Sequence, residues 1–196
     1  MSPVQSVSDK RFFRPGWFWA APLAAVAVSS PPLSPWLQTT MAGHMLVQMP
    51  LLLLLGGAWG GRVTLLPAAA DPWGLTGLVW FVGTHLFWWI PRSLDLATLQ
   101  PGWGALMHGS LFAAGWALGQ SWARAPFALQ GTLAVHLVAL LLAMGVIYQG
   151  ALFVVCQSYP LEQQQEMGGL LFWGAGGLYL LLVVWAGIKL GGKKIG

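Results

Sequence analysis

The sequence predicts an all-α protein, a polytopic bundle of about six transmembrane helices, and three observations support this prediction. The chain of 196 residues is 57% hydrophobic and 7% charged, and its mean hydropathy is +0.67. Long parts of it carry no formal charge, namely residues 16–61, 72–91, 96–123, 125–161 and 167–188. A helix that crosses a hydrocarbon core of ~30 Å needs about 20 such residues. Composition and run length together therefore predict an integral membrane protein.

Prolines divide the uncharged runs into separate helices. Pro31, Pro32 and Pro35 break the first run, because proline lacks the N–H donor that a helix interior needs. Further prolines and glycines mark the other junctions, among them Pro67 and Pro160. The predicted helices span residues 16–30, 38–59, 74–91, 103–122, 127–155 and 168–190. The first of these, with about 15 residues, is short for a membrane span.

The basic residues indicate how the helices are oriented. If six helices alternate in direction, only Arg92 falls on the side opposite to the other basic residues. Those on the common side are Lys10, Arg11, Arg14, Arg62, Arg124, Lys189, Lys193 and Lys194. Positively charged segments stay in the cytoplasm, so we expect a cytoplasmic segment at 1–15, one transmembrane domain at 16–190 and a cytoplasmic basic tail at 191–196. This topology accounts for the net charge of +4 without a nucleic-acid partner.

The same topology places three carboxylates on the outer connections, Asp95, Glu162 and Glu166. They either attract a cation or dock a donor protein, or they are solvated loop charges. Cys156, the only cysteine, also falls on the outer rim. A single cysteine forms no intramolecular disulfide, so it is either a packed thiol or a metal or redox residue.

Four histidines stand in four different apolar helices, and they are the strongest indication of a functional site. An imidazole is costly to bury in an apolar environment without a partner, so histidines inside a membrane point to function. His44, His85 and His108 each lie about 8–9 Å of helix rise from the outer edge of the predicted helices. His136 lies roughly 15 Å from the inner edge, close to the midplane. We therefore expect a layer of three histidines and one outlier.

Methionines accompany two of these histidines. Met41, His44, Met45 and Gln48 recur at spacings that place them on one face of a helix, and Met107 precedes His108. Thioethers with imidazole form a soft set of ligands, better suited to Cu(I) than to magnesium or calcium. Methionines in a membrane helix also fill gaps in packing, and a histidine can simply hydrogen-bond across helices.

The chain lacks the arrangements typical of a soluble enzyme. It has no Walker glycine loop followed by Lys and Ser or Thr, and no zinc-protease His-Glu-x-x-His motif. Ser110 follows His108 by two residues, which places the two side chains on different faces of a helix. The sequence therefore predicts a protein that is not an enzyme.

Four segments carry a distinctive order of histidines, glycines and glutamines: Gly43–Gly56, His85–Ala97, Leu106–Gly115 and Leu161–Trp173. In this order the chain resembles the CtaG-type cytochrome c oxidase assembly factors, as a short and divergent member. His44, His85 and His108 fall on the histidine positions of that family. The resemblance covers roughly residues 38–190.

The resemblance implies a multi-pass protein of the bacterial cytoplasmic membrane that helps to mature a haem-copper oxidase. Its implied task is to bind copper at the outer side and to pass it to an oxidase subunit or another respiratory membrane complex. The expected ligands of Cu(I) are His44, His85 and His108 with Met41 or Met45, and the candidate additional ligands are His136 and Met107.

The chain departs from the family pattern at several positions. Gln48, followed by Met49, stands where the family has a second histidine one turn after His44. Gly104 and Met107 stand where the family has a histidine and an acidic residue. The family also has about seven helices, which is more than this sequence predicts. Either the metal site is reduced to a set of histidines and methionines, or this member has left the copper role.

Two other functions fit the residues. In a b-type cytochrome subunit, histidines from facing helices bind haem iron from both sides, and one histidine per helix suits that scheme. Two such haems would need the four imidazoles in two pairs of equal depth, so a single haem near the outer side is the more natural version. In a purely structural membrane subunit, the histidines only hydrogen-bond, and the 13 tryptophans and 26 glycines serve packing.

Overall fold

A computed structural model of the protein describes residues 18–62, 69 and 71–191. Every regular element in these ranges is a helix, which confirms the all-α class. The elements are α2 (Ala20–Ser29), α3 (Leu33–Leu37), the π-helix η1 (Gly43–Gln48), α4 (Met49–Gly60), α5 (Leu75–Trp89), α6 (Pro91–Leu99), α7 (Pro101–Trp122), α8 (Phe127–Gln149) and α9 (Leu161–Gly191). The predicted segment 1–15, nearly all of the predicted tail 191–196, and Pro67 lie outside the described residues.

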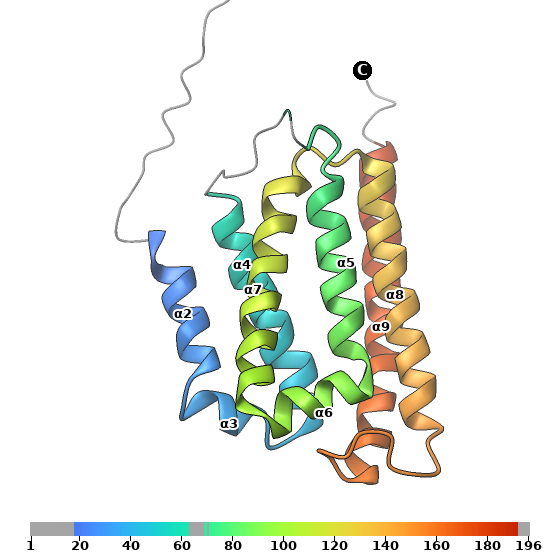
Figure 1. The fold of residues 1–196 in the computed structure, drawn as a ribbon. Helices are drawn as coiled ribbons and strands as arrows, with labels where there is room; N and C mark the ends of the chain where they lie inside the picture. The colour runs from blue at the N-terminus through green and yellow to red at the C-terminus, as the bar shows by residue number, and fades with distance from the viewer. Residues whose placement is uncertain (1–17, 63–68, 70, 192–196) are drawn as a thin grey trace, which may run out of the picture.

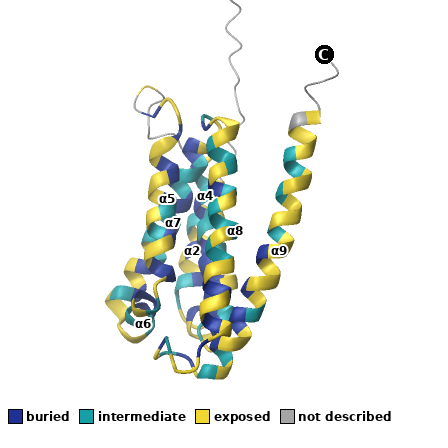
Figure 2. Cartoon of the chain, turned by 90° about the vertical axis from the view of Figure 1, so that its right-hand side faces the viewer, coloured by how far each residue is buried: buried dark blue, intermediate teal, exposed yellow. Residues whose placement is uncertain are grey.

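The longer helices lie side by side in a bundle (Figure 1). α7 packs along α4 and also contacts α5, while α8 packs along α9. The short helices α3 and α6 and the loop 150–160 close one end of the bundle, and α9 finishes at the opposite end (Figure 1). Seen from the side, α9 stands apart from α5 and α7 and is exposed along most of its length (Figure 2).

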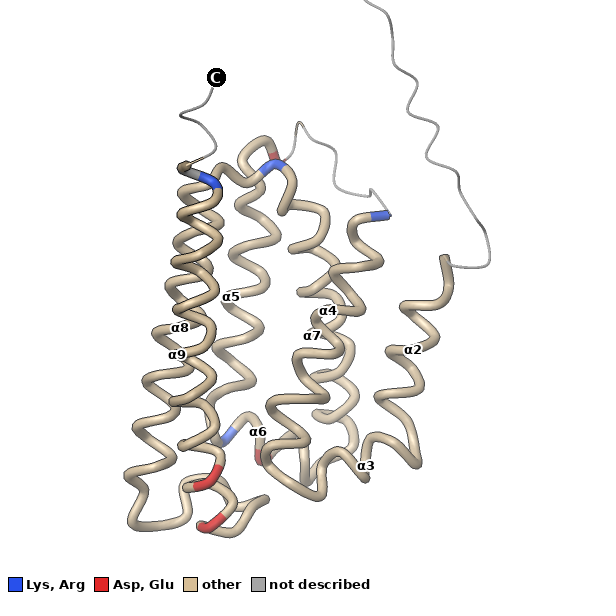
Figure 3. Tube along the Cα trace, turned by 180° about the vertical axis from the view of Figure 1, so that it is seen from behind, with Lys and Arg blue, Asp and Glu red and all other residues tan. Residues whose placement is uncertain are grey.

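The described charges are divided between the two ends of the bundle (Figure 3). The end that we call the basic end holds Arg62, Arg124 and Lys189, with Asp71 as its carboxylate. The end that we call the acidic end carries Asp95, Glu162 and Glu166, together with Arg92. Between the two ends the described helices carry no formal charge. An uncharged belt flanked by charged ends is typical of a helix bundle in a bilayer.

Three of the described helical stretches are long and apolar enough to cross a membrane. They are Gly43–Gly60, which joins η1 to α4, Phe127–Gln149 and Leu161–Lys189. Many large apolar side chains on α8 and α9 are exposed, among them Val135, Leu180 and Leu181. Such surface has no favourable contact with water, so these helices fit a lipid environment.

Glycines bring α4 and α7 into close contact. A Cβ atom added at Gly56 would collide with the carbonyl oxygen of Phe112, and one added at Gly115 would collide with the carbonyl oxygen of Leu53. Small residues on facing helices let the two backbones approach, and dispersion contacts then stabilise the pair. The predicted helices 38–59 and 103–122 are thus neighbours, held together by glycines on both.

Several helix boundaries differ from the predicted ones. The sequence predicts a connection at 92–102, whereas the structure forms α6 from Pro91 to Leu99, because proline is favourable in the first turn of a helix. The predicted helix 127–155 ends at Gln149, where Gly150 follows. α9 begins at Leu161 rather than at 168, because Pro160 precedes it and Glu and Gln are good helix formers. Glu162 and Glu166 therefore belong to the first turns of a helix.

Candidate functional site

His44 lies in a stretch of helix with an unusual geometry. Residues Gly43–Gln48 form a π-helix, in which the N–H of Met49 donates to the carbonyl of His44, five residues earlier. Pro50 follows immediately, and its ring would clash with the carbonyl four residues before it in a regular α-helix. The wider π turn relieves that clash. Short π-helices occur frequently at functional sites, so this geometry singles out the predicted His44 face.

The imidazole of His44 has one partner and one free nitrogen. Its side chain is fully buried, and Nδ1 lies 2.8 Å from the hydroxyl of Tyr159. The other ring nitrogen, Nε2, is buried and has no hydrogen-bond partner among the described residues. A buried polar atom without a hydrogen-bond partner costs free energy, so this nitrogen is a candidate ligand atom. Tyr159, on the loop 150–160, was not predicted from the sequence.

Buried methionines are the second predicted component of the site. All six methionines of the described ranges belong to one buried cluster of the core: Met41, Met45, Met49, Met107, Met144 and Met167. Five of them expose 1% or less of their surface, and Met144 exposes 7%. The predicted candidates Met41, Met45 and Met107 are therefore brought into one cluster from η1, the turn before it and α7. Met167 from α9 joins them, which the sequence did not predict.

The four histidines influence one another two by two. The imidazole of His44 is close enough to that of His108 for an electrostatic interaction, and the imidazole of His85 interacts in the same way with that of His136. In the described part of the chain, no three His, Cys, Asp or Glu side chains form a group that could hold a metal ion. The structure therefore does not bring His44, His85 and His108 together into one such group.

Positions counted along the helices from the basic end agree with these two interactions. His85 and His136 lie about 15 and 14 Å along α5 and α8, whereas His108 and His44 lie about 21 and 24 Å along α7 and the joined helix η1–α4. The prediction counted from the outer ends, where α8 continues 13 residues beyond His136 to Gln149 and α5 only four beyond His85 to Trp89. His136 interacts with His85, although the sequence predicts it as an outlier.

The pair His85 and His136 has an apolar environment. The ring of His85 stacks on Phe81 with centroids 5.4 Å apart and meets Trp89 edge-on at 5.0 Å. Leu133, one turn before His136, packs with Phe81 in a second, smaller core cluster. Nδ1 of His85 and Nε2 of His136 are buried without a hydrogen-bond partner among the described residues, as is Nε2 of His108. Each of the four histidines thus keeps one unused ring nitrogen.

Gln48, which replaces a family histidine, has a structural role. Its side chain is fully buried, and Nε2 donates to the carbonyl of Val28 at 3.0 Å and to the hydroxyl of Ser34 at 2.9 Å. Its Oε1 accepts a hydrogen bond from Gln38 at 3.1 Å. The amide therefore connects η1 to α2 and α3, and both of its N–H donors are used in doing so.

Asp95, predicted as an outer acidic residue, anchors the loop 150–160. Its carboxylate accepts hydrogen bonds from the thiol of Cys156 at 2.9 Å, from the N–H of Gln157 at 2.9 Å, and from both the N–H and the hydroxyl of Ser158 at 2.8 and 2.7 Å. Burial raises the pKa of Asp95, but these hydrogen bonds outweigh burial and hold the pKa below its ordinary value. Asp95 is thus not a free carboxylate.

Gln164 fixes the same loop from α9. Its Oε1 accepts hydrogen bonds from the N–H groups of Val155 and Cys156, and its Nε2 donates to the carbonyls of Cys156 and Tyr159. Cys156 is a fully buried free thiol, and burial together with the neighbouring carboxylate of Asp95 raises its pKa to about 12. It is therefore a packed thiol, one of its two predicted roles. The anchored loop holds Tyr159 against His44.

A pocket opens at the acidic end beside the methionine cluster. It has a volume of about 190 Å³ and is lined by Thr40, Met41, Ala42, Gln163, Glu166 and Met167. Glu166 is exposed, as is Glu162 one turn earlier, so both keep the solvent-facing position that the sequence predicts. Only Glu166 lines the pocket.

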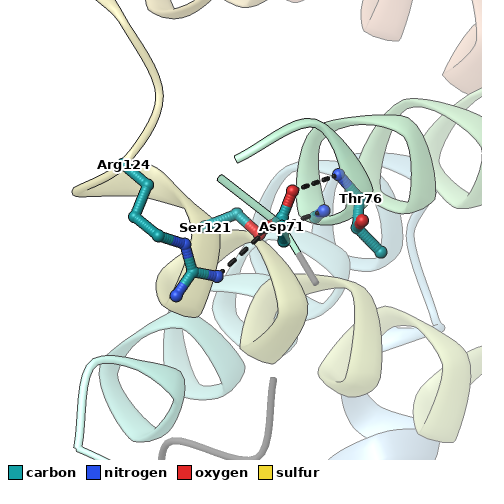
Figure 4. Close-up of polar contacts among 5 residues, drawn as sticks. Asp71, Thr76, Ser121 and Arg124 are labelled. Carbon is teal, nitrogen blue, oxygen red and sulfur yellow. Dashed lines mark hydrogen bonds and ion pairs between the residues drawn. The ribbon is translucent and has the colours of Figure 1, made fainter. Parts of the chain in front are cut away.

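A polar network at the basic end was missed in the sequence. Asp71 exposes only 2% of its surface, and its carboxylate accepts hydrogen bonds from the hydroxyl of Ser121 at 2.6 Å and from the N–H of Thr76 at 3.1 Å (Figure 4). Arg124 forms a salt bridge with it at 3.2 Å. Burial raises the pKa of Asp71, but these contacts outweigh burial and lower the pKa. The network joins the start of α5 to the end of α7.

Comparison with known proteins found no matching protein-family model, no matching curated protein and no matching solved structure.

Proposed function

We propose that this protein is a membrane assembly factor for a haem-copper oxidase, which binds copper(I) near the outer side of the membrane and delivers it to an oxidase subunit. Copper(I) is the cargo of this activity. The resemblance to the CtaG-type factors supplies the task. Two observations carry the proposal: the described methionines are all buried in one core cluster, and the fully buried His44 on the same helical stretch as Met41 and Met45 keeps an Nε2 without a hydrogen-bond partner among the described residues.

The chemistry of the cluster supports copper(I) over other metals. Thioethers and imidazoles, the groups of the proposed site, are neutral and soft to borderline ligands. A neutral site of this kind suits a monovalent soft cation, whereas magnesium, calcium and zinc favour charged oxygen or thiolate ligands. We assign the binding group to His44 and His108 with Met41, Met45 and Met107 as the available thioethers.

Tyr159 sets the ring of His44 for this role. When Nδ1 carries the proton, it donates to the hydroxyl oxygen of Tyr159, and Nε2 keeps its lone pair for the metal ion. Most metal-binding histidines are oriented in this way, by a hydrogen bond from the ring nitrogen that does not bind the metal ion. Methionine ligands bind copper(I) without a charge, so exchange between neighbouring thioethers lets the ion leave toward a partner protein.

The division of charge supports an orientation in the membrane. The basic end holds Arg62, Arg124 and Lys189, and the positive-inside rule assigns that end to the cytoplasm. The acidic end, with its pocket and loop 150–160, then faces the outer side. We propose six membrane-crossing segments, in which α2, α5 and α7 accompany the three longer apolar stretches, with both termini in the cytoplasm of a bacterial cell.

The proposal is tested by copper(I) binding to the full-length protein purified in detergent under anaerobic conditions. A competing chelator of known affinity reports how much copper the protein holds. We expect His44→Ala and His108→Ala to lose most of the bound copper(I), and His136→Ala, a matched change in the other pair, to keep it. Oxidase activity in cells should fall with the same two variants. Unchanged copper content and oxidase maturation in both would contradict the proposal.

One observation favours a second candidate, a b-type cytochrome subunit. The imidazoles of His44 and His108, and those of His85 and His136, come from different helices and are close enough to interact electrostatically, and bis-histidine haem binding needs two histidines from facing helices. His85 and His136 would hold a haem, which supplies one-electron transfer when bound. For His44 and His108 the close contact of α4 and α7 through Gly56 and Gly115 disfavours a porphyrin between those helices. A reduced-minus-oxidised spectrum of purified protein with a b-type haem band would favour this candidate over copper delivery.

A further inference from the structure

The pocket at the acidic end is built from two segments that are far apart in the sequence. Thr40, Met41 and Ala42 precede η1, and Gln163, Glu166 and Met167 lie in the first turns of α9. A hydrogen bond of 3.0 Å from the N–H of Met41 to Oε1 of Gln163 holds the two walls together. The pocket is therefore a fixed part of the fold at this end of the bundle.

The side chains of the pocket change from charged to soft with depth. Glu166 is exposed and has no ion-pair partner among the described residues, so its charge is directed to solvent at the mouth. Met41 and Met167 expose none of their surface to bulk solvent and form the closed side. A carboxylate attracts any cation electrostatically, whereas two thioethers retain only a soft one. This order of groups selects a soft monovalent cation that arrives from water.

Met41 connects the pocket to the buried cluster. It lines the pocket and also lies three residues before His44 and four before Met45, on the same side of the helix. Met167 belongs to the same core cluster as Met45 and Met107. The two thioethers of the pocket thus belong to the same buried core as Met45 and Met107, and Met41 lies within one turn of His44 in the chain.

We propose that this pocket is a loading site, where copper(I) from the outer side first binds to Met41 and Met167 under the charge of Glu166 before it passes to His44. The inference rests on the proposed copper function, and it adds a kinetic role for Glu166 and Met167. Copper remains copper(I) throughout, because the transfer only exchanges neutral ligands. The carboxylate raises the local concentration of the cation and does not itself remain a ligand of the buried ion.

The test is a stopped-flow measurement of copper(I) uptake by the full-length protein under anaerobic conditions, with equilibrium copper content measured on the same samples. We expect Glu166→Gln to slow uptake by about tenfold at low salt and to remove much of its dependence on ionic strength. We expect Met167→Leu to slow uptake as well. Neither variant should change the equilibrium copper content.

Each variant has a matched control in the chain. Glu162→Gln removes an exposed carboxylate one turn earlier on α9 that does not line the pocket, and Met144→Leu removes a thioether of the same core cluster on α8. Both control variants should take up copper(I) at the wild-type rate. Uptake by Glu166→Gln and Met167→Leu at the rates of their controls would overturn the loading site.

The remaining outcomes separate this inference from the proposed function. If Met167→Leu lowers the equilibrium copper content, Met167 is a ligand of the buried ion and the loading role is wrong, while copper binding itself stands. If the wild-type protein takes up no copper(I), the proposed function fails and the loading site fails with it.

Discussion

The hydroxyl of Tyr159 and Nδ1 of His44 lie 2.8 Å apart, although 115 residues separate them in the chain. The contact joins the loop at the acidic end to the π-helix inside the bundle. The other ring nitrogen, Nε2, is buried without a partner among the described residues. The hydroxyl of Tyr159 therefore orients the ring of the candidate copper ligand.

Removal of that hydroxyl should weaken copper(I) binding. In Tyr159→Phe the ring of His44 loses its orienting partner, and changes of this kind lower metal affinity by about 10- to 100-fold. Chelator competition with purified protein measures the effect. The control is Tyr148→Phe, because the hydroxyl of Tyr148 is buried but has no hydrogen-bond partner among the described residues. Equal affinities for the two variants would show that Tyr159 does not position His44.

The contact between α4 and α7 should not tolerate a methyl group at Gly115. A Cβ atom there meets the backbone of Leu53, so Gly115→Ala should lower the thermal midpoint of unfolding in detergent. Gly109 lies on the same helix with open space around its Cα, and Gly109→Ala should raise stability by up to about 1 kcal/mol through helix propensity. We expect the two variants to change stability in opposite directions. A similar small gain in stability for both variants would mean that α4 and α7 do not pack as described.

The buried carboxylate of Asp71 should stabilise the protein in a pH-dependent way. Its pKa is lower in the folded protein than in the unfolded chain, so its contribution is present above the unfolded pKa and is lost as the pH falls through the folded pKa. Asp71→Asn should lower the free energy of unfolding at pH 7 by about 1–3 kcal/mol, the range for hydrogen bonds to a charged group.

Thermal unfolding measured from pH 7 down to about pH 3 checks this prediction, because the unfolded pKa of aspartate is about 3.9. The stability difference between wild type and Asp71→Asn should shrink as the pH falls below about 4. Glu162→Gln, at an exposed residue, serves as the control. A difference that stays constant over this range would rule out the carboxylate as its source.

The thiol of Cys156 should react slowly with maleimide in the folded protein. It is fully buried, and its pKa is raised to about 12, so the reactive thiolate is scarce at pH 7.5. Asp95→Ala removes four hydrogen bonds to the loop 150–160 and should speed labelling, because local opening then exposes the thiol. Glu162→Ala is the matched change on α9. Rapid labelling of the wild type would contradict the anchored loop.

The sequence predicted those features that depend on composition and local spacing. The helical class, the uncharged belt and the face of Met41, His44 and Met45 follow from runs and periods that a helix imposes. The segregation of Arg62, Arg124 and Lys189 to one end, with acidic residues at the other, is also visible in the order of charges along the chain.

The features that it did not predict depend on how helices rotate and which ones are neighbours. The interaction of His85 with His136 depends on where α5 and α8 end, and hydropathy does not record helix ends to within one turn. Tyr159 reaches His44 only because Asp95 and Gln164 fold the loop back, and loop paths have no periodic signal. Asp71 lies in a proline-rich connection, and nothing in the local sequence indicates that its carboxylate forms a buried salt bridge with Arg124.

The burial of the methionines also determines which of them an oxidant can reach. A thioether that gains one oxygen becomes a polar, chiral sulfoxide, which disrupts an apolar core and no longer offers the same soft sulfur. Met45, Met49 and Met107 are enclosed by the bundle, and Met41 and Met167, which themselves expose none of their surface, form one side of the pocket at the acidic end. An oxidant that enters the pocket should therefore reach Met41 and Met167 first, and reductases that repair their sulfoxides would have to reach the acidic end of the bundle.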